Sequence, residues 1–410
     1  MVDITFVLLG ISIILFLGLI AEFIFKKTHI PDILFLIIIG FFIGPNVLKL
    51  VEPSEVAVYA PIFTTFALLF LLYEGAFYTS LKSFAQGAAK GLQITIFNFL
   101  VSSVGIGIIM YFFGYPIIIS MLTGFILGGV SSAFVIPLLK YLRIKKKTYS
   151  VLLLEAALTD VLVIVFSFAA IELVMSNSIN MWNMLWNIIS FFGMAIIVGL
   201  IAGFAYILFV AEVLNKNAPY MMTIAYLLIV YALAESMHGN GAIATLVLGI
   251  MLKNSRPIII GIRHRLNRKH DDKKITIVIK THEEVFYSQV SFFLKTFFFV
   301  YIGLLFNINN SRILSIAAVL ALTILFLRRL SGLVTKKFPH YDRSVINSMF
   351  ARGLAAAAIA QVVVISDMPY ASDISAITYA FIVFTIILSS ITIFIVKKSH
   401  HRQQMHNVNV

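Results

Sequence analysis

The chain has 410 residues, 60% of them hydrophobic and 12% charged, with a mean hydropathy of +1.00. Soluble domains are about 45–50% apolar and about 25% charged, so the composition excludes an ordinary soluble domain and predicts an integral membrane protein. Cysteine is absent, which excludes disulfides, thiol nucleophiles and cysteine-ligated metal sites.

Apolar segments follow one another along the whole chain, and each is a candidate transmembrane helix, because a helix crosses the hydrocarbon with about 20 apolar residues. The segments are 4–25, 32–51, 60–79, 91–113, 117–138, 150–175, 186–211, 219–236, 240–253, 286–306, 312–330, 345–365 and 374–396. The first lacks a basic leader and a small-residue cleavage site, which predicts a retained helix rather than a signal peptide. The ninth is short and follows the turn sequence MHGNG. We therefore predict an all-α membrane protein with 13 transmembrane helices.

The net charge of +13 would suit nucleic-acid binding if the basic residues were not gathered in loops. With the N-terminus outside, the external loops hold only Lys49 and Arg312, and the cytoplasmic side holds nearly all the rest. This is the positive-inside rule, so we predict a multi-pass protein of the cell membrane with a cytoplasmic C-terminus and no nucleic-acid partner. We expect a transmembrane domain over 1–396, with a basic cytoplasmic loop at 254–285, and a cytoplasmic tail over 397–410. A solvated loop is the simplest interpretation of 254–285; contact with anionic lipid and a regulatory role stay open.

Seven ionisable residues lie well inside the predicted helices, where such groups face a protein interior or a wet cavity. They are Glu22, Glu74, Glu155, Asp160, Glu235, Lys295 and Arg352. Glu22 and Glu235 are near helix ends, which favours structural roles. The role of Glu74 stays open: it could cap a helix, form an ion pair or line an ion path. Lys295 either extends toward the cytoplasmic surface or takes part in function.

Glu155 and Asp160 lie five residues apart, so about 140° separates them around a helix. They do not share one face, which argues against a pair of carboxyl groups acting together in acid–base catalysis. Arg352 is the one deeply placed arginine among the predicted helices, and an ion pair between Glu155 and Arg352 would lessen two desolvation costs together. We therefore predict that Glu155 pairs with Arg352 and that Asp160 is left unpaired and titratable.

Two segments predict irregular backbone at membrane depth. The fifth contains Gly128, Gly129 and Pro137, and the twelfth contains Arg352–Gly353 before a run of alanine. Broken helices occur in membranes only where they face protein or water, and they mark binding sites between inverted repeats of transporters. Close helix packing through small residues is the alternative for the fifth segment alone. The two segments hold corresponding positions in the two halves of the chain, which favours a transporter.

Several motifs together resemble the monovalent cation:proton antiporter superfamily, the sodium/hydrogen exchangers, over roughly 1–396. HIPDILFLIIIGFFIGPNVL (29–48) is similar to the second helix of that family. LLFLLYEGAFYTSLKSF is similar to the third helix, and AESMHGNGAIATLVLGIMLKN to a later Ala-Glu…Gly-Ala…Gly segment. GGVSSAFVIPLL resembles the unwound crossing helix, EAALTDVLVI the ion-binding helix and FARGLAAAA the Arg-Gly helix. The motifs occur in the order that the family has.

The resemblance implies two inverted six-helix repeats, a homodimer, and a core that moves like an elevator past a rigid dimerisation domain. It implies that Asp160 binds the cation or the proton, and that Thr159 takes the place of an Asn or second Asp. The further ligands that it implies are Val130, Ser131 and Ser132. Relatives with an acidic residue at position 131 or 159 have anchors that this chain lacks, so the full ligand set stays open. Lys295 corresponds to a functional lysine of some electrogenic relatives.

We therefore expect an antiporter that exchanges Na⁺ for H⁺ by alternating access, electroneutrally and one for one. Burial makes an empty charged Asp160 costly, so protons and cations compete for it, and hard monovalent cations prefer its oxygen ligands. A K⁺/H⁺ antiporter of the same fold and a cation channel are the alternatives; filter-like repeats for a channel are missing. An enzyme is not expected, since HEEVF lacks the second histidine of a metalloprotease motif and no G-x-S-x-G occurs. We expect no cofactor besides the transported ions, and expect lipid as the surrounding partner.

Overall fold

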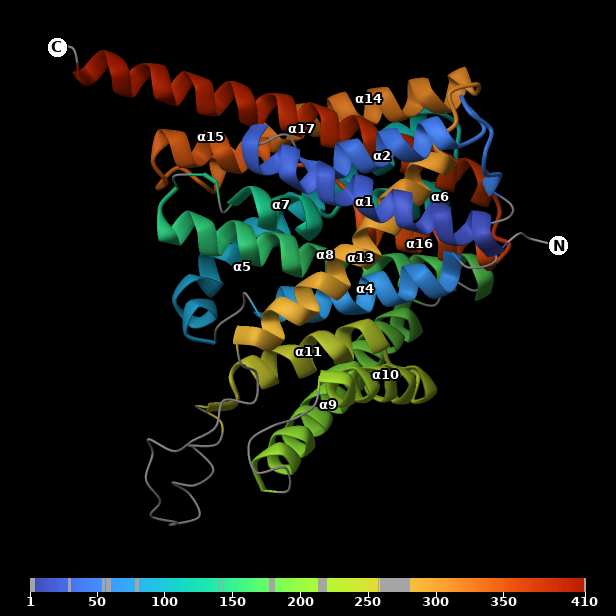
Figure 1. Cartoon of the computed structure of the whole chain (residues 1–410), viewed down its shortest axis with the longest axis vertical. Coiled ribbons are helices and arrows are strands. Elements are labelled where there is room, and N and C mark those ends of the chain that lie inside the picture. Colours follow the sequence, from blue (N-terminus) through green and yellow to red (C-terminus); the bar gives the residue numbers. More distant parts are fainter. Residues whose placement is uncertain are drawn as a thin grey trace. The chain divides into compact units, whose positions relative to one another are not determined.

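The structure is a computed structural model of the whole chain. It describes residues 4–28, 31–53, 56, 60–77, 81–139, 141–142, 144–176, 181–212, 220–256, 258 and 281–408. In this part of the chain every regular element is a helix (Figure 1).

The first half of the chain forms helices that match the first seven predicted segments. They are α1 (Ile4–Thr28), α2 (Asp32–Ile43), α4 (Ala60–Phe77), α5 (Leu81–Phe112), α6 (Ile117–Ile126), α7 (Ser132–Leu139), α8 (Lys146–Ser176) and α9 (Met181–Glu212). Some boundaries differ from the prediction, such as the start of α5 at Leu81 rather than 91. Helix α2 ends at Ile43 rather than 51, because Gly44 and then Pro45 interrupt it. The segment 117–138 is two helices with an irregular stretch between them.

The second half continues with helices over the remaining predicted segments. They are α10 (Tyr220–Ser236), α11 (Gly241–Lys253), α13 (Thr281–Leu305), α14 (Ser311–Leu327), the 3₁₀ helix η2 (Arg328–Leu333), α15 (His340–Ser348), α16 (Leu354–Ile365) and α17 (Ala371–Val408). The segment 345–365 is divided between α15 and α16. Helix α17 runs past the predicted end of its span at 396 without a break. Most of the loop 254–285 lies outside the described residues.

Seven of the described helices are long and apolar enough to cross a membrane. These spans are Leu8–Thr28, Lys90–Phe112, Lys146–Met175, Ile189–Val210, Val285–Leu305, Ser311–Leu333 and Ala371–His400. Helices α2, α6, α10, α11 and α16 are also apolar but are shorter. The molecule is therefore an all-helical membrane protein with many spans. The count of 13 crossings and the inverted repeat stay predictions.

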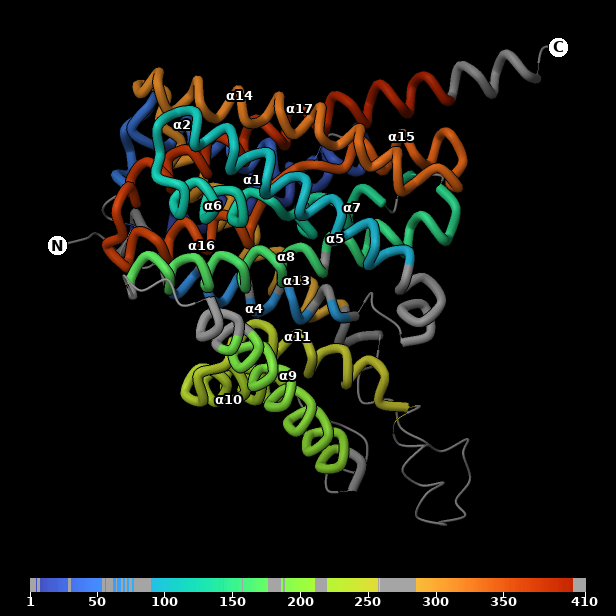
Figure 2. Tube along the Cα trace, turned by 180° about the vertical axis from the view of Figure 1, so that it is seen from behind, coloured from blue at the N-terminus to red at the C-terminus, as the bar shows by residue number. Residues whose placement is uncertain are grey.

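The helices divide into two compact units. One comprises Met1–Thr65, Gly87–Ser178 and Phe293–Val410, and the other Phe66–Gln86 and Ile179–Phe292. In the first unit α6 packs on α8, and α17 packs on both α14 and α16; Figure 2 shows α14 and α17 running side by side. In the second unit α9 packs on α10 and α11, where Tyr206 shares a hydrogen bond with Thr223 and Tyr226 donates one to the Ala202 carbonyl.

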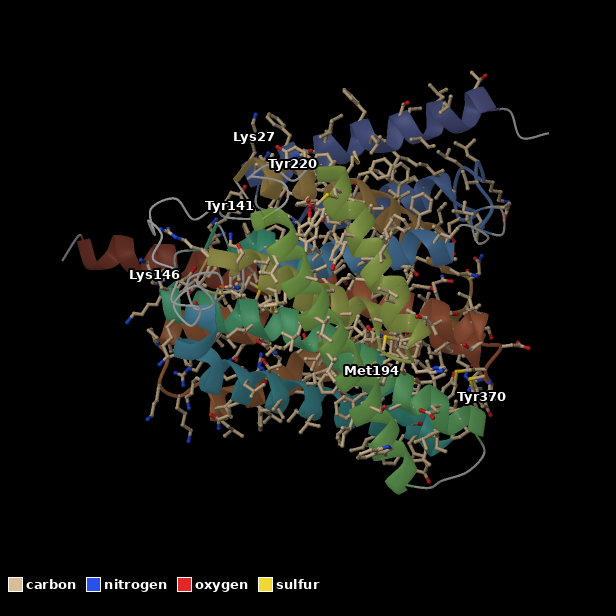
Figure 3. The ribbon with its side chains drawn as sticks, turned by 90° about the horizontal axis from the view of Figure 1, so that it is seen from below. Lys27, Tyr141, Lys146, Met194, Tyr220 and Tyr370 are labelled. Carbon is tan, nitrogen blue, oxygen red and sulfur yellow. The ribbon has the colours of Figure 1, made fainter. Side chains whose placement is uncertain are left out.

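The first unit has basic residues at one of its ends. Lys27 and Lys146 lie toward one end and Tyr370 toward the other in the view of Figure 3. Helix α8 begins at the basic end, and α16 finishes near the end that carries Tyr370. Helix α8 therefore begins at a face that carries basic residues, as the positive-inside pattern predicts for one side of the membrane.

Candidate ion-binding site

Two broken helices meet in the middle of the first unit. Residues 127–131 separate α6 from α7, and residues 349–353 separate α15 from α16. The Ser131 N–H donates a hydrogen bond of 2.9 Å to the Ala351 carbonyl, so each stretch satisfies part of the other's backbone. A Cβ atom on Gly353 would lie 2.2 Å from Ser131 Oγ, so only glycine permits this approach. The predicted breaks at Gly128–Gly129 and Arg352–Gly353 are both present.

Helix α8 holds the first of these stretches through the Thr159 hydroxyl. The Val130 N–H donates to Thr159 Oγ1 at 2.9 Å. The same hydroxyl lies 3.2 Å from the carbonyl oxygens of Val130 and Ala156, either of which can accept its proton. One buried side chain thereby satisfies a backbone donor that the missing helical turn leaves without a partner.

Asp160 is 7% exposed and lies on α8 beside the start of α7. Ser132, the first residue of α7, donates a hydrogen bond from its hydroxyl to Asp160 Oδ2 at 2.6 Å, the short length expected for a charge-assisted bond. A carboxylate at this position also faces the positive end of the α7 dipole. The structure thus brings together the five residues predicted as ion ligands, at one crossing of broken helices; that they bind an ion stays a prediction.

The predicted partner of Glu155 is wrong. The fully buried Glu155 carboxylate pairs with Arg328 rather than Arg352: Nη1 contacts Oε1, and Nη2 donates to Oε2 at 2.8 Å. Asn98 Nδ2 donates to Oε1 at 2.8 Å, and Arg328 Nε donates to the Ile346 carbonyl at 3.0 Å. The planar guanidinium of Arg328 binds both oxygens of the Glu155 carboxylate at once. The Asn98 amide on α5 adds a third hydrogen bond to the same carboxylate. The network joins α5, α8, η2 and α15.

Arg352 is 2% exposed and lies in the irregular stretch before α16. Its backbone N–H donates to Thr385 Oγ1 on α17 at 3.2 Å. Within the described residues, its Nε and Nη1 atoms have no hydrogen-bond partner, and neither does Ser131 Oγ. Arg352 is therefore fixed by its backbone, whereas Arg328 is the guanidinium that neutralises Glu155.

The other ionisable residues named from the sequence lie apart from this crossing. Lys295 on α13 forms an ion pair of 2.5 Å with Asp32 at the start of α2, both side chains being largely buried. Glu22 pairs with Lys26 one turn away at 2.9 Å, and Glu235 accepts a hydrogen bond of 2.8 Å from the Gly241 N–H at the start of α11. Both contacts fit the structural roles predicted for Glu22 and Glu235. Glu74 lies in α4, and its side chain is outside the described set.

Sequence reasoning missed four polar residues of this unit. Arg328 was counted with the basic residues of the cytoplasmic side, and Asp342 lies between the predicted segments 312–330 and 345–365, yet both are nearly inaccessible to solvent. Asp342 on α15 contacts the Thr148 hydroxyl and accepts a hydrogen bond from the Lys145 N–H at 3.3 Å, so it holds the start of α8. Asn98 and Asp32 lie in apolar runs and were passed over. A polar residue inside an apolar run was the available signal for those two.

The chemistry of the site suits one monovalent cation. Among the described residues no group of three or more His, Cys, Asp or Glu side chains converges on a metal position. The crossing instead offers one carboxylate, the hydroxyls of Ser131 and Ser132, and backbone carbonyls of the irregular stretch, all hard oxygen donors. Arg328 neutralises Glu155, whereas Asp160 forms no ion pair within the part of the chain that the structure describes.

A family model described as "Sodium/hydrogen exchanger, transmembrane" matches residues 11–398. The chain belongs to the sodium/hydrogen exchanger family. This chain is 26% identical over 310 residues to a protein of Methanocaldococcus jannaschii named "Probable Na(+)/H(+) antiporter 2". The match covers 72% of this chain and 68% of that protein.

The fold of this exchanger-family chain is similar to that of the sodium proton antiporter MjNhaP1 from Methanocaldococcus jannaschii. A structure of MjNhaP1 at pH 8 has a TM-score of 0.76 at 22% identity and covers 94% of this chain and 95% of that one. A second, from an electron-microscopy map, has a TM-score of 0.73 at 21% identity and covers 96% and 95%. The similarity extends over nearly the whole of both chains, so this chain has the fold of that antiporter. The 13-helix count and the inverted repeats of the predicted fold stay predictions.

Proposed function

We propose that this protein exchanges Na⁺ for H⁺ across a membrane, with Asp160 binding either ion. The observation that carries the proposal is the Asp160 carboxylate, 7% exposed and hydrogen-bonded by Ser132 at the crossing of two broken helices. Membership of the sodium/hydrogen exchanger family supports cation/proton exchange, and the named antiporter of Methanocaldococcus jannaschii supports Na⁺ over K⁺.

The coupling follows from the cost of an empty site. A bare carboxylate in the membrane interior is unfavourable, so Asp160 carries either a proton or a cation when the site moves between the two sides. If only these two loaded states move, a cation crosses one way for each proton that crosses the other way. With Glu155 held by Arg328, one titrating carboxylate exchanges one charge for one charge, which makes the exchange electroneutral.

The ligands proposed for the cation are Asp160, the Ser132 and Ser131 hydroxyls and the Val130 backbone carbonyl. Thr159 has a different role in this proposal. Its hydroxyl already accepts the Val130 N–H, so Thr159 fixes the position of the irregular stretch rather than donating to the ion directly. We propose that alternating access moves this site past the rest of the molecule within a homodimer, as the family resemblance implies.

The test uses purified protein in vesicles with an imposed pH gradient that a fluorescent dye reports. Addition of Na⁺ should collapse the gradient, and choline should not. Addition of K⁺ or Li⁺ in parallel measures selectivity; a response to K⁺ alone would replace Na⁺ by K⁺ as the substrate. The proposal is wrong if no monovalent cation collapses the gradient, or if Na⁺ flows without any proton movement, as in a channel.

A further inference from the structure

Helix α16 combines a smooth buried face with a single polar side chain. It reads LAAAAIAQVVVI, and every residue from Leu354 to Ala360 is at most 5% exposed. A face built from alanine has no large side chains that interlock with a neighbour, so it resists lengthwise sliding less than a face of leucine or phenylalanine. Gln361 follows this run and is partly buried. An amide withdrawn from water is costly unless it is hydrogen-bonded.

Gln361 joins three helices. Its Nε2 donates a hydrogen bond of 2.5 Å to Tyr379 Oη on α17 and a longer one of 3.3 Å to Tyr301 Oη on α13. Tyr301 is 8% exposed and Tyr379 is 4% exposed, while Gln361 between them is partly buried. We call these three residues the Gln361 cluster. Gln361 lies eight residues after Gly353, which is about 12 Å along α16 from the crossing of broken helices.

Tyr301 belongs to a helix pair formed by α2 and the later part of α13. Cβ atoms on Gly40 and Gly303 would lie 1.9 Å from the Val300 carbonyl oxygen and 2.1 Å from the Ile37 carbonyl oxygen, so the backbones are in direct contact. At one end of this contact Lys295 pairs with Asp32. At the other end Asn46 Nδ2 donates to the Phe306 carbonyl at 2.7 Å. These contacts fix the position of α13, and with it Tyr301, relative to α2.

Gln361 and Tyr379 belong to a second helix pair, α16 with α17. The two helices pack together, and the Arg352 N–H donates to Thr385 on α17, so the irregular stretch that crosses Ser131 is attached to the same pair. The bond from Gln361 to Tyr379 is therefore internal to this pair. The bond from Gln361 to Tyr301 instead connects it to the α2–α13 pair.

We propose that Gln361 and Tyr301 form a latch between these two helix pairs, and that the latch opens and closes once in each exchange cycle. The inference rests on the proposed function, because it assigns the latch to the movement that carries Asp160 from one side to the other. The alanine face lets α16 slide along its neighbours, and the directional bond from Gln361 holds it in the position seen here. The latch is a positioning device and contributes no ligand to the ion.

The latch predicts that tying Tyr301 to Gln361 covalently stops exchange. The chain has no cysteine, so cysteines can be introduced without changing any other residue. In a Tyr301→Cys/Gln361→Cys variant, a bifunctional thiol reagent with a cleavable disulfide should arrest Na⁺/H⁺ exchange in vesicles, and a reductant should restore it. The matched control is Tyr379→Cys/Gln361→Cys, whose tie lies inside one helix pair and should leave exchange at the rate of the unlinked variant.

Exchange that continues at the control rate after linking Tyr301 to Gln361 would overturn the latch. Arrest by both ties alike would also overturn it, since the effect would then come from constraining α16 itself. Wild-type protein that exchanges no cation would overturn the proposed function, which the same assay detects before any reagent is added.

Removal of single hydroxyls tests the latch without a reagent. Tyr301→Phe deletes the bond between the pairs and should change the maximal exchange rate or the apparent cation affinity by about 2- to 10-fold, the effect of one neutral hydrogen bond on a conformational equilibrium. Thermal stability of Tyr301→Phe should stay close to wild type, because the phenylalanine ring fills the buried site of the tyrosine ring and Tyr379 keeps its own position. A Tyr301→Phe protein with unchanged rate and affinity would contradict the proposal even if the cysteine variants did not fold.

Discussion

Glu155 and Asp160, two carboxyl groups in the middle of α8, have different polar partners. The Glu155 carboxylate accepts hydrogen bonds from the Arg328 guanidinium and the Asn98 amide, whereas the Asp160 carboxylate accepts hydrogen bonds from Ser132, a neutral residue. A buried carboxylate that is fully paired holds the helices around it together, and one that is not fully paired keeps the capacity to take a proton or a cation. The difference between these two environments is the residue-level basis of the proposed exchange.

Arg328→Ala should destabilise the protein more than Arg352→Ala. Loss of Arg328 leaves Glu155 buried without its counter-charge, which costs about 3–5 kcal/mol. Arg352 forms no equivalent ion pair in the described residues, so its removal should reduce the free energy of unfolding by less. Thermal unfolding in detergent, followed by intrinsic fluorescence, measures both. Equal losses, or a larger loss for Arg352→Ala, would show that Glu155 depends on Arg352 instead.

Thr159→Val should weaken the crossing, and Thr159→Ser should largely preserve it. Valine has the shape of threonine but leaves the Val130 N–H without its acceptor, which costs about 1–3 kcal/mol when buried. Serine keeps the hydroxyl. We expect Thr159→Val to lower both thermal stability and the maximal exchange rate, measured on the same preparation. A Thr159→Val protein as stable as Thr159→Ser would mean that the hydroxyl does not support the irregular stretch.

At the scale of elements, the sequence indicated where helices break but not which side chains meet. Gly128–Gly129 and Arg352–Gly353 carry their own local signal, because glycine and a charged residue interrupt an apolar run. The partner of Glu155 carries no such signal. Arg328 lies 173 residues away and follows an apolar helix directly, so it resembled an ordinary basic residue of a cytoplasmic loop. Only the return of η2 and α15 onto α8 brings it into contact.

The α2–α13 pair decides the interpretation of Lys295. The resemblance placed a transport lysine at this position, but in the structure Lys295 is paired with Asp32, a residue that drew no attention in the sequence. Asp32→Ala should lower thermal stability, and Asp32→Ala/Lys295→Met should recover most of the loss, because no buried charge then lacks its partner. The double variant should still exchange cations for protons in vesicles. A stable double variant without exchange would make Lys295 a member of the transport machinery.

At the scale of the whole molecule, the composition predicted the many apolar helices, and the distribution of Lys and Arg along the chain predicted that basic residues gather on one side of the membrane. The crossing arrangement was foreseen from the family resemblance rather than from periodicity. Breaks within α6–α7 and α15–α16 place Asp160 beside irregular backbone inside an otherwise continuous helical bundle. Hydropathy alone cannot report such breaks, because the residues on both sides of each break are equally apolar.

Electroneutral exchange is a property of the whole cycle. Moving one net charge across 100 mV changes the free energy by about 2.3 kcal/mol, roughly 50-fold in an equilibrium ion ratio. If one Na⁺ replaces one H⁺, an imposed membrane potential should leave both the exchange rate and the final ion ratio nearly unchanged. The measurement uses vesicles with a clamped potential of either sign. A clear dependence on its sign would mean that a second charge moves.

The most direct test of the account is Asp160→Asn. Asparagine keeps the shape of the side chain and an oxygen that can accept the Ser132 hydroxyl bond, but it loses the charge and the ability to take up a proton. The matched control is Glu155→Gln/Arg328→Gln, which removes a buried ion pair without leaving a charge behind. In vesicles with an imposed pH gradient, Asp160→Asn should be folded yet no more active than empty vesicles, while the control keeps measurable Na⁺/H⁺ exchange. Exchange by Asp160→Asn at a rate near wild type would contradict the account and move the ion-binding site to another residue.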